Sequence, residues 1–157
     1  MEGRPERVQN ITRQLRVVFR AIQSHSKTVE RTCGLSSAKL WMMSELSVNP
    51  GLKVSELARA LMIHASTCSN MLDQLEDKGL VRRDRSRADQ RAVHLYLTDA
   101  GVKLLAKAPG PAQGTLSSAF GRLGDGHLLQ LEDGLSALVD AMQVKDEKGG
   151  LVPIYGE

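Results

Sequence analysis

The sequence has little of what marks secreted, metal-binding or membrane proteins. Its 157 residues include two cysteines, Cys33 and Cys68, with no CxxC pair and no histidine at ligand spacing. This pattern fits a reducing compartment better than a disulfide scaffold and offers no metal site. The N-terminal residues form no apolar signal segment, and no apolar run reaches the roughly 18 residues of a membrane span. We therefore expect a cytoplasmic protein with no membrane partner.

Signatures of catalysis are also missing. None of the four histidines, His25, His64, His94 and His127, has an accompanying nucleophile and orienting group in its sequence neighbourhood. The chain has no glycine-rich phosphate loop and no paired-carboxylate motif. We expect a protein that is not an enzyme and that holds no cofactor.

Charge is distributed unevenly along a chain whose net charge is only +3. Five arginines fall between residues 82 and 91 against two aspartates, and residues 1–31 carry seven basic and three acidic side chains. From residue 125 onward there are seven carboxylates and two lysines. The length and the hydrophobic content of 41% fit one folded domain. The asymmetry predicts one face for a polyanion and another for a different partner.

Residues 6–31 have apolar side chains at alternating three- and four-residue steps, which predicts an amphipathic helix of roughly seven turns. Gly34 is expected to end it. So narrow a stripe on so long a helix either covers the core of its own chain or forms the seam of a dimer. The stripe consists of Val8, Ile11, Leu15, Val18, Ile22 and Val29.

A second helix follows around residues 38–46. Its apolar stripe, Leu40, Met43 and Leu46, is expected to face the core, whereas Trp41 and Met42 point elsewhere. Trp41 is the only tryptophan of the chain. It is interpreted either as a filler of the core or an interface, or as a wall of an apolar ligand pocket.

Residues 54–61 and 64–79 predict two short helices separated by a break at Met62 and Ile63. In the second of them the apolar stripe makes Cys68 a core residue rather than a reactive thiol. The opposite face carries small polar side chains near a helix N-terminus, which suit contacts to phosphates and bases but also serve as ordinary caps. The stripe consists of Cys68, Met71, Leu72 and Leu75, and the polar face of Ser66, Thr67, Ser69, Asn70, Asp73 and Gln74.

Gly79 ends that helix, and two segments of alternating polarity follow around an arginine-rich loop at residues 85–90. In the second segment Val93, Leu95 and Leu97 alternate with polar or small residues. This pattern predicts a two-stranded antiparallel ribbon. On its own it could be a solvated hairpin. Because it follows a helix-turn-helix pattern, we interpret it as a wing whose arginines enter a minor groove.

Three short motifs in this region resemble the MarR family of bacterial transcriptional regulators. They are LEDKGLVRR at 75–83, DQR at 89–91 and LTDAG at 97–101, and the similarity spans roughly residues 35–101. The resemblance implies a mainly α fold with a small β-wing, a winged helix-turn-helix between long N- and C-terminal dimerisation helices. It also implies a homodimer that binds a pseudopalindromic operator in double-stranded DNA, usually as a repressor. A small, aromatic or carboxylate-bearing effector would release it.

The residues expected to contact DNA follow from the helix faces and the resemblance together. Asp89 is expected to orient the wing. The proposed contacts are Lys53, Ser55, His64, Ser66, Thr67, Ser69, Asn70, Gln74, Arg82, Arg85, Arg87, Gln90 and Arg91.

Three positions depart from the family pattern. Met62 stands where the family's turn often has glycine, and since methionine tolerates a left-handed conformation poorly, we expect a differently shaped turn. His64 replaces the usual Ser or Thr cap and is either an exposed residue without a role or a pH-sensitive cap. Asn70 stands where arginine is common and could pair with adenine.

By resemblance, an effector pocket would lie between the dimerisation helices and the winged region. Its expected residues are Phe19, Ile22, His25 and Trp41, with Arg16 or Arg20 as the partner of a carboxylate. The alternative function is a thiol-based redox sensor that uses Cys33, whose pKa the nearby Arg31 could lower.

The remaining sequence predicts helices interrupted by Pro109 and Pro111. The last of them has leucines at three- and four-residue steps over 128–142, a second stripe that suggests a dimerisation layer. We divide the single structural domain into an N-terminal dimerisation helix (1–34), the winged helix-turn-helix (35–97), C-terminal dimerisation helices (98–145) and a flexible tail (146–157).

Overall fold

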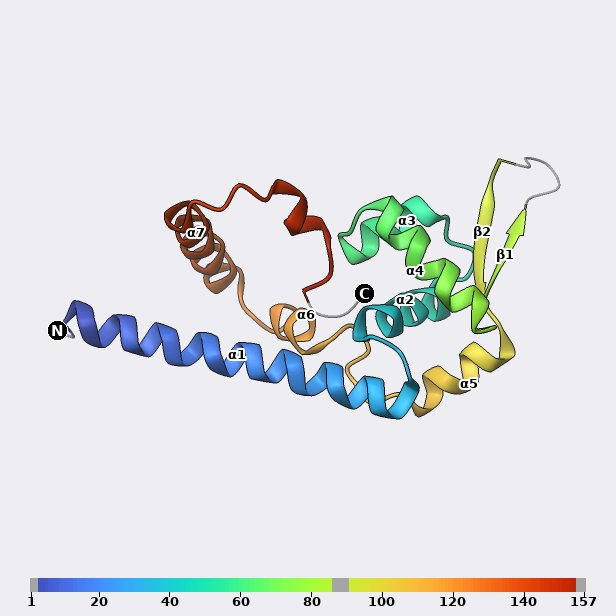
Figure 1. Cartoon of the computed structure of the whole chain (residues 1–157), viewed down its shortest axis with the longest axis horizontal. Helices are drawn as coiled ribbons and strands as arrows, with labels where there is room; N and C mark the ends of the chain where they lie inside the picture. Colours follow the sequence, from blue (N-terminus) through green and yellow to red (C-terminus); the bar gives the residue numbers. More distant parts are fainter. Residues whose placement is uncertain (1–2, 86–90, 155–157) are drawn as a thin grey trace.

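The computed structural model describes residues 3–85 and 91–154, apart from the side chain of Glu147. Figure 1 shows a long helix α1 beside a helical body with a two-stranded wing at one end and a separate helix α7 at the other. Within the described ranges no helix is long and apolar enough to cross a membrane, and no group of three or more His, Cys, Asp or Glu side chains could hold a metal. The elements are α1 (Arg4–Cys33), α2 (Ser37–Val48), α3 (Val54–Leu61), α4 (Ala65–Asp77), β1 (Val81–Arg85), β2 (Val93–Leu97), α5 (Asp99–Lys107), α6 (Thr115–Phe120), α7 (Asp125–Met142) and a 3₁₀ helix (Glu147–Leu151).

The long N-terminal helix is confirmed and extends two residues beyond each predicted end. It ends at Gly34, whose left-handed conformation (φ 68°) lets its N–H donate to the carbonyl of Glu30. The C-terminal half packs against α2, α5 and α6 and buries Ser26 and Val29. The N-terminal half projects beyond this body, so the stripe residues Val8 and Ile11 are exposed (Figure 1).

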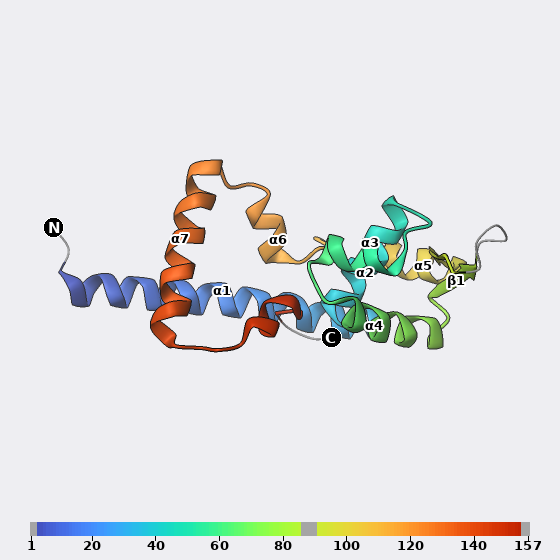
Figure 2. The same cartoon turned by 90° about the horizontal axis from the view of Figure 1, so that it is seen from above.

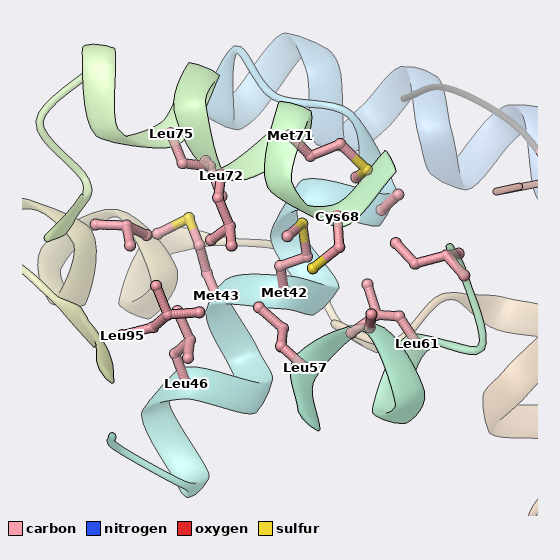
Figure 3. Close-up of a cluster of buried hydrophobic side chains, with 14 of the residues drawn as sticks. Met42, Met43, Leu46, Leu57, Leu61, Cys68, Met71, Leu72, Leu75 and Leu95 are labelled. Atoms are coloured by element: carbon pink, nitrogen blue, oxygen red, sulfur yellow. The ribbon is translucent and has the colours of Figure 1, made fainter. Parts of the chain in front are cut away.

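Helix α2 is the centre of the core. Its cap is Ser36, whose hydroxyl accepts a hydrogen bond from the Lys39 N–H at 3.3 Å. The prediction that Met42 points away from the core is wrong: its side chain is fully buried and lies beside Leu57 and Cys68 (Figure 3). Because α1, α3, α4, α5 and β2 all contact α2, its buried face is wider than one helical stripe.

The turn between α3 and α4 contains a residue in the left-handed conformation. Met62 adopts φ 58° and ψ 43°, so the expectation of a differently shaped turn is wrong. Two backbone hydrogen bonds hold this conformation, from Met62 N–H to Arg59 at 3.1 Å and from Ile63 N–H to Ala58 at 3.0 Å. The side chain of Ile63 is buried while that of Met62 is exposed, so packing at Ile63 offsets the backbone cost at Met62.

The wing is a two-stranded antiparallel sheet, as predicted. Its register pairs Val81 with Leu97 and Arg85 with Val93, and Leu52 adds a single bridge to Leu95. Before it, Gly79 takes φ 72° and the Leu80 N–H bonds the carbonyl of Leu75 at 3.0 Å, which closes α4. The tip loop, residues 86–90, lies outside the described residues.

After the wing, the Thr98 hydroxyl accepts from the Gly101 N–H at 3.1 Å and donates to the carbonyl of Gly79 at 2.6 Å. This places α5 directly against the turn that opens the wing. The predicted interruption is present: residues 108–114, with Pro109 and Pro111, separate α5 from α6. Helix α7 then stands apart from the winged region in both views (Figures 1 and 2).

The C-terminal segment folds back towards the body of the molecule. The carboxylate of Asp146 accepts from the Gly149 N–H at 2.9 Å and caps the short 3₁₀ helix. The carbonyl of Leu151 then accepts a hydrogen bond from the His64 N–H at 3.0 Å. Residues 147–151, for which the sequence predicts only loop, are therefore attached to the residue that precedes α4.

Candidate nucleic-acid interface

The two faces of α4 are separated as the sequence predicts. Figure 3 shows Cys68, Met71, Leu72 and Leu75 pointing into the core towards α2 and α3, where all four are buried. The polar side chains lie on the opposite side of the helix: Ser66, Asn70, Asp73 and Gln74 are exposed, and Thr67 and Ser69 are half-buried. The helix thus presents small hydrogen-bonding groups to solvent on a rigid support.

Arg83 of β1 links the wing to α4 through an ion pair and a hydrogen bond. Its guanidinium lies 2.7 Å from the carboxylate of Asp73 and 3.6 Å from that of Glu76, and it donates to the carbonyl of Ser69 at 3.4 Å. The carboxylate of Asp73, which the sequence predicts on the polar face, is therefore paired with an arginine of the same chain. Sequence reasoning missed the role of Arg83 because all five arginines near the wing carried the same charge signal. The alternation of β1 distinguishes them, since Arg82 and Arg83 must point to opposite faces of the strand.

Arg82 is held on the other face of the ribbon. Its guanidinium lies 2.9 Å from the carboxylate of Asp84 and 4.4 Å from the centre of the Tyr96 ring, its cross-strand neighbour. Arg85 ends β1 and Arg91 precedes β2, and both are exposed. The predicted residues Arg87, Asp89 and Gln90 lie outside the described residues.

The other proposed contacts lie at the starts of α3 and α4. Lys53 and Ser55 are exposed at the start of α3, where the Lys53 N–H donates to the carboxylate of Glu56 at 3.1 Å. His64 matches neither interpretation of it. Its side chain makes no capping bond, and its Nε2 is buried without a hydrogen-bond partner in the part of the chain that the structure describes. Its backbone N–H donates to the carbonyl of Leu151 in the C-terminal segment.

A cavity of about 110 Å³ lies between α1, α2, the end of α3, α6 and the C-terminal segment. Three residues proposed from helix facing, Ile22, His25 and Trp41, line it. Arg16, Phe19 and Arg20 do not, and Arg20 lies along a shallow groove on a different face of α1. The lining residues that sequence reasoning did not propose are Ser37, Ala38, Leu61, Ile63, Gln113, Gly114, Thr115, Leu116, Ser117, Pro153 and Ile154.

Two buried polar atoms at this cavity have no hydrogen-bond partner among the described residues, the Nε2 of His25 and the hydroxyl of Thr115. Burial also lowers the pKa of His25 below its usual value, so the ring is neutral near pH 7. The indole N–H of Trp41 donates to Glu45 at 3.2 Å and is occupied. Unpaired polar atoms in a partly enclosed space are where an added molecule gains hydrogen bonds.

The cysteines behave differently from what the redox alternative requires. Burial raises the pKa of the Cys33 thiol, so the expected lowering by Arg31 is wrong. Burial raises the pKa of Cys68 to about 11 against a smaller opposing effect of Arg83, in keeping with its place in the core. Burial therefore disfavours the thiolate form of both cysteines.

Comparison with known sequences matches the same region. A model of the MarR family matches residues 35–93. The transcriptional regulator HosA of Escherichia coli is 32% identical over 95 residues, which cover 60% of this chain and 69% of HosA. The transcriptional repressor MdtR of Bacillus subtilis is 31% identical over 101 residues, 64% of this chain and 65% of MdtR. The chain spans about half to two thirds of the length of the first curated relatives that it matches.

Comparison with solved structures extends the match to nearly the whole chain. The structure of Sco3205, a MarR family transcriptional regulator from Streptomyces coelicolor in complex with DNA, aligns with a TM-score of 0.61. The alignment covers 94% of this chain and 97% of that one at 20% identity, which shows a common fold. With the winged region matched in sequence and the long helices matched in shape, the chain belongs to the MarR family.

Proposed function

We propose that this chain is a sequence-specific, DNA-binding transcriptional regulator that acts as a homodimer, represses transcription and is released by a small effector. The observation that carries the proposal is the exposed polar face of α4 beside an arginine-bearing wing that Arg83 attaches to it. A helix in the major groove and a ribbon in the flanking minor groove need such a fixed relation to read one DNA site together.

On α4, Asn70 is the candidate for base recognition, since its amide can bond the N6 and N7 edge of adenine. Ser66 and Ser69, near the helix N-terminus, suit contacts to phosphates. On the wing, Arg85 and Arg91 are exposed close to the tip. Their role would be to attract the backbone and the narrow groove, which strengthens binding to many sequences.

The homodimer is supported by apolar surface that the single chain leaves exposed. On α1, Val8, Ile11, Leu15 and Val18 are 42–53% exposed, and on α7 Leu131, Leu135 and Leu138 are 38–41% exposed. Both sets repeat at three- and four-residue steps, the pattern that helix pairs bury. A two-fold reader would follow from pairing them between copies.

Repression is the regulatory direction that the relative MdtR is named for. Effector release is supported by the position of the cavity. Leu61 and Ile63, at the turn before α4, form part of its wall, and so do Pro153 and Ile154 of the segment that bonds the His64 N–H. A molecule in the cavity would contact both supports of the start of α4 and could shift that helix.

A binding assay on a selected duplex tests DNA recognition. Duplexes enriched from a random library by the purified protein would be titrated across a range of salt concentrations, with a scrambled duplex of equal composition as reference. We expect Arg85→Ala to weaken binding to both duplexes and to reduce the slope against log salt by about one. Asn70→Ala should chiefly lower the preference for the selected duplex, by about 1–3 kcal/mol.

The matched control is Arg122→Ala, which removes an exposed arginine between α6 and α7, far from α4 and the wing. It should leave both affinities and the salt slope close to those of the parent. Failure to enrich any duplex, or equal effects of Arg85→Ala and Arg122→Ala at every salt concentration, would contradict the proposed interface.

The alternative of a redox sensor at Cys33 has less support, because burial raises the pKa of that thiol. We expect peroxide treatment to leave the affinity for the selected duplex unchanged, in the parent and in Cys33→Ser alike. A loss of affinity in the parent that Cys33→Ser prevents would favour the redox function instead.

A further inference from the structure

The cavity contains no formal charge among the residues that the structure describes. Its lining is made of apolar side chains and five polar ones that are neutral near pH 7: Ser37, Gln113, Thr115, Ser117 and His25. The arginines of α1 that could neutralise an anion are not part of the wall, and Arg20 lies along a different face of that helix.

Because the described wall has no cation, it favours an uncharged ligand over an anion. A carboxylate moved out of water without a charged partner loses several kcal/mol of solvation, and hydroxyl or imidazole groups recover only part of it. The carboxylate of Glu45 accepts a hydrogen bond from the indole of the wall residue Trp41, and its negative charge would repel an anion. An uncharged molecule avoids this cost and still satisfies the two unpaired atoms, since a neutral imidazole and a hydroxyl can each donate or accept.

The volume limits the size of the ligand. At about 110 Å³ the cavity is somewhat smaller than one of about 150 Å³ that holds a benzene ring, and it is partly open at the surface. Trp41 and Ile22 supply apolar walls, and the unpaired atoms of His25 and Thr115 supply polar contacts.

We propose that the cavity binds an uncharged, single-ring molecule that carries both a hydrogen-bond donor and an acceptor, and that it excludes the corresponding carboxylate. This inference rests on the proposed role of the cavity as the effector site. It replaces the expectation of a carboxylate held by Arg16 or Arg20, because neither arginine lines the cavity.

Benzamide and benzoate make a direct test because they have nearly the same shape and differ in charge. Trp41 is the only tryptophan of the chain and lines the cavity, so its fluorescence reports binding in the full-length protein. At pH 7.5 and constant ionic strength we expect benzamide to change the emission saturably, with a Kd around 1 mM or tighter. Benzoate should bind at least about tenfold more weakly, which corresponds to about 1.4 kcal/mol.

Variants locate the binding in the cavity. Thr115→Val and His25→Phe each remove one unpaired polar atom, and each should weaken benzamide about three- to tenfold, the usual range for one neutral hydrogen bond. The control is Thr28→Val, which removes a hydroxyl on α1 that bonds Ser24 and does not line the cavity. Circular dichroism of each variant checks that the fold is retained.

Three results would overturn the inference: no saturable change with benzamide up to about ten times that Kd, benzoate binding as tightly as benzamide, or equal affinities for Thr115→Val and Thr28→Val. Binding of the selected duplex is measured on the same samples. Intact duplex binding with any of these three results would reject the neutral-ligand inference and leave the DNA-binding proposal standing. Loss of duplex binding in the parent would reject that proposal separately.

Discussion

The winged region and the terminal helices use the same residue types in opposite ways. Between α2 and β2 most leucines and methionines pack into one core, in which Leu72, Leu75 and Leu95 are fully buried. On α7 the leucines at the same helical spacing are exposed, and the helix contributes no buried residue. Apolar periodicity therefore predicts a face that needs covering but does not say which surface covers it.

Truncating one leucine in each region should give the largest difference in the free energy of unfolding. Leu72→Ala should lower the free energy of unfolding by about 3 kcal/mol or more, because a fully buried side chain leaves a cavity. Leu129→Ala, at a position 60% exposed on α7, should change it by less than about 0.5 kcal/mol. Urea unfolding followed by circular dichroism measures both. Equal losses would mean that the two regions form one cooperative core.

A charge in the α7 stripe tests whether a second copy covers it. Leu135→Glu should raise the dimer dissociation constant at least about 100-fold, since a carboxylate would lie in an apolar seam. Gln130→Glu adds the same charge outside the stripe and should leave that constant nearly unchanged. Sedimentation equilibrium gives both values. A dimer that tolerates Leu135→Glu would place the seam elsewhere.

Gly101 and Gly134 differ in the space that a side chain would have. A side-chain carbon at Gly101 would overlap the carbonyl oxygen of Leu80, whereas one at Gly134 meets no atom within 4 Å. Gly101→Ala should therefore destabilise the protein by about 1–3 kcal/mol. Gly134→Ala, inside α7, should stabilise it by up to about 1 kcal/mol through helix propensity. Thermal melts at equal protein concentration distinguish the two. A destabilising Gly134→Ala would show that α7 is closely packed in solution.

The smallest expected effect concerns the turn before α4. Met62 is an exposed residue in a left-handed conformation, so Met62→Gly relieves backbone strain while adding freedom to the unfolded chain. We expect a net stabilisation of up to about 1 kcal/mol, with DNA affinity unchanged, as measured by urea unfolding and duplex titration. Val48→Gly, in the last turn of α2 and also exposed, should destabilise instead.

Much of the winged region could be predicted from the sequence because its signals are local. The stripe of α4, the alternation of β2 and the caps at Gly34 and Gly79 each depend on neighbouring residues and agree with the structure. The errors arose where several elements meet. A single helical stripe predicts Met42 outside the core, whereas five elements contact α2 and bury that side chain as well.

Some residues of the candidate sites are also predictable from local patterns, and others are not. Helix facing was enough to suggest Ile22, His25 and Trp41, since each follows from the phase of one helix. The participation of Thr115 and Pro153, and the attachment of the C-terminal segment to His64, depend on contacts between segments that lie far apart along the chain. No local pattern contains that information.

The sequence by itself determined that this chain has two short helices and a basic ribbon in a fixed order, because helix and strand periodicity depend on nearest neighbours along the chain. Tertiary structure alone decided which charges stay available. It paired Arg83 with Asp73 and placed Arg82 against Asp84 and Tyr96, and within the described ranges it put no cation in the cavity wall. Charge acts through space with a strength set by distance and burial, and neither can be known until the chain has folded.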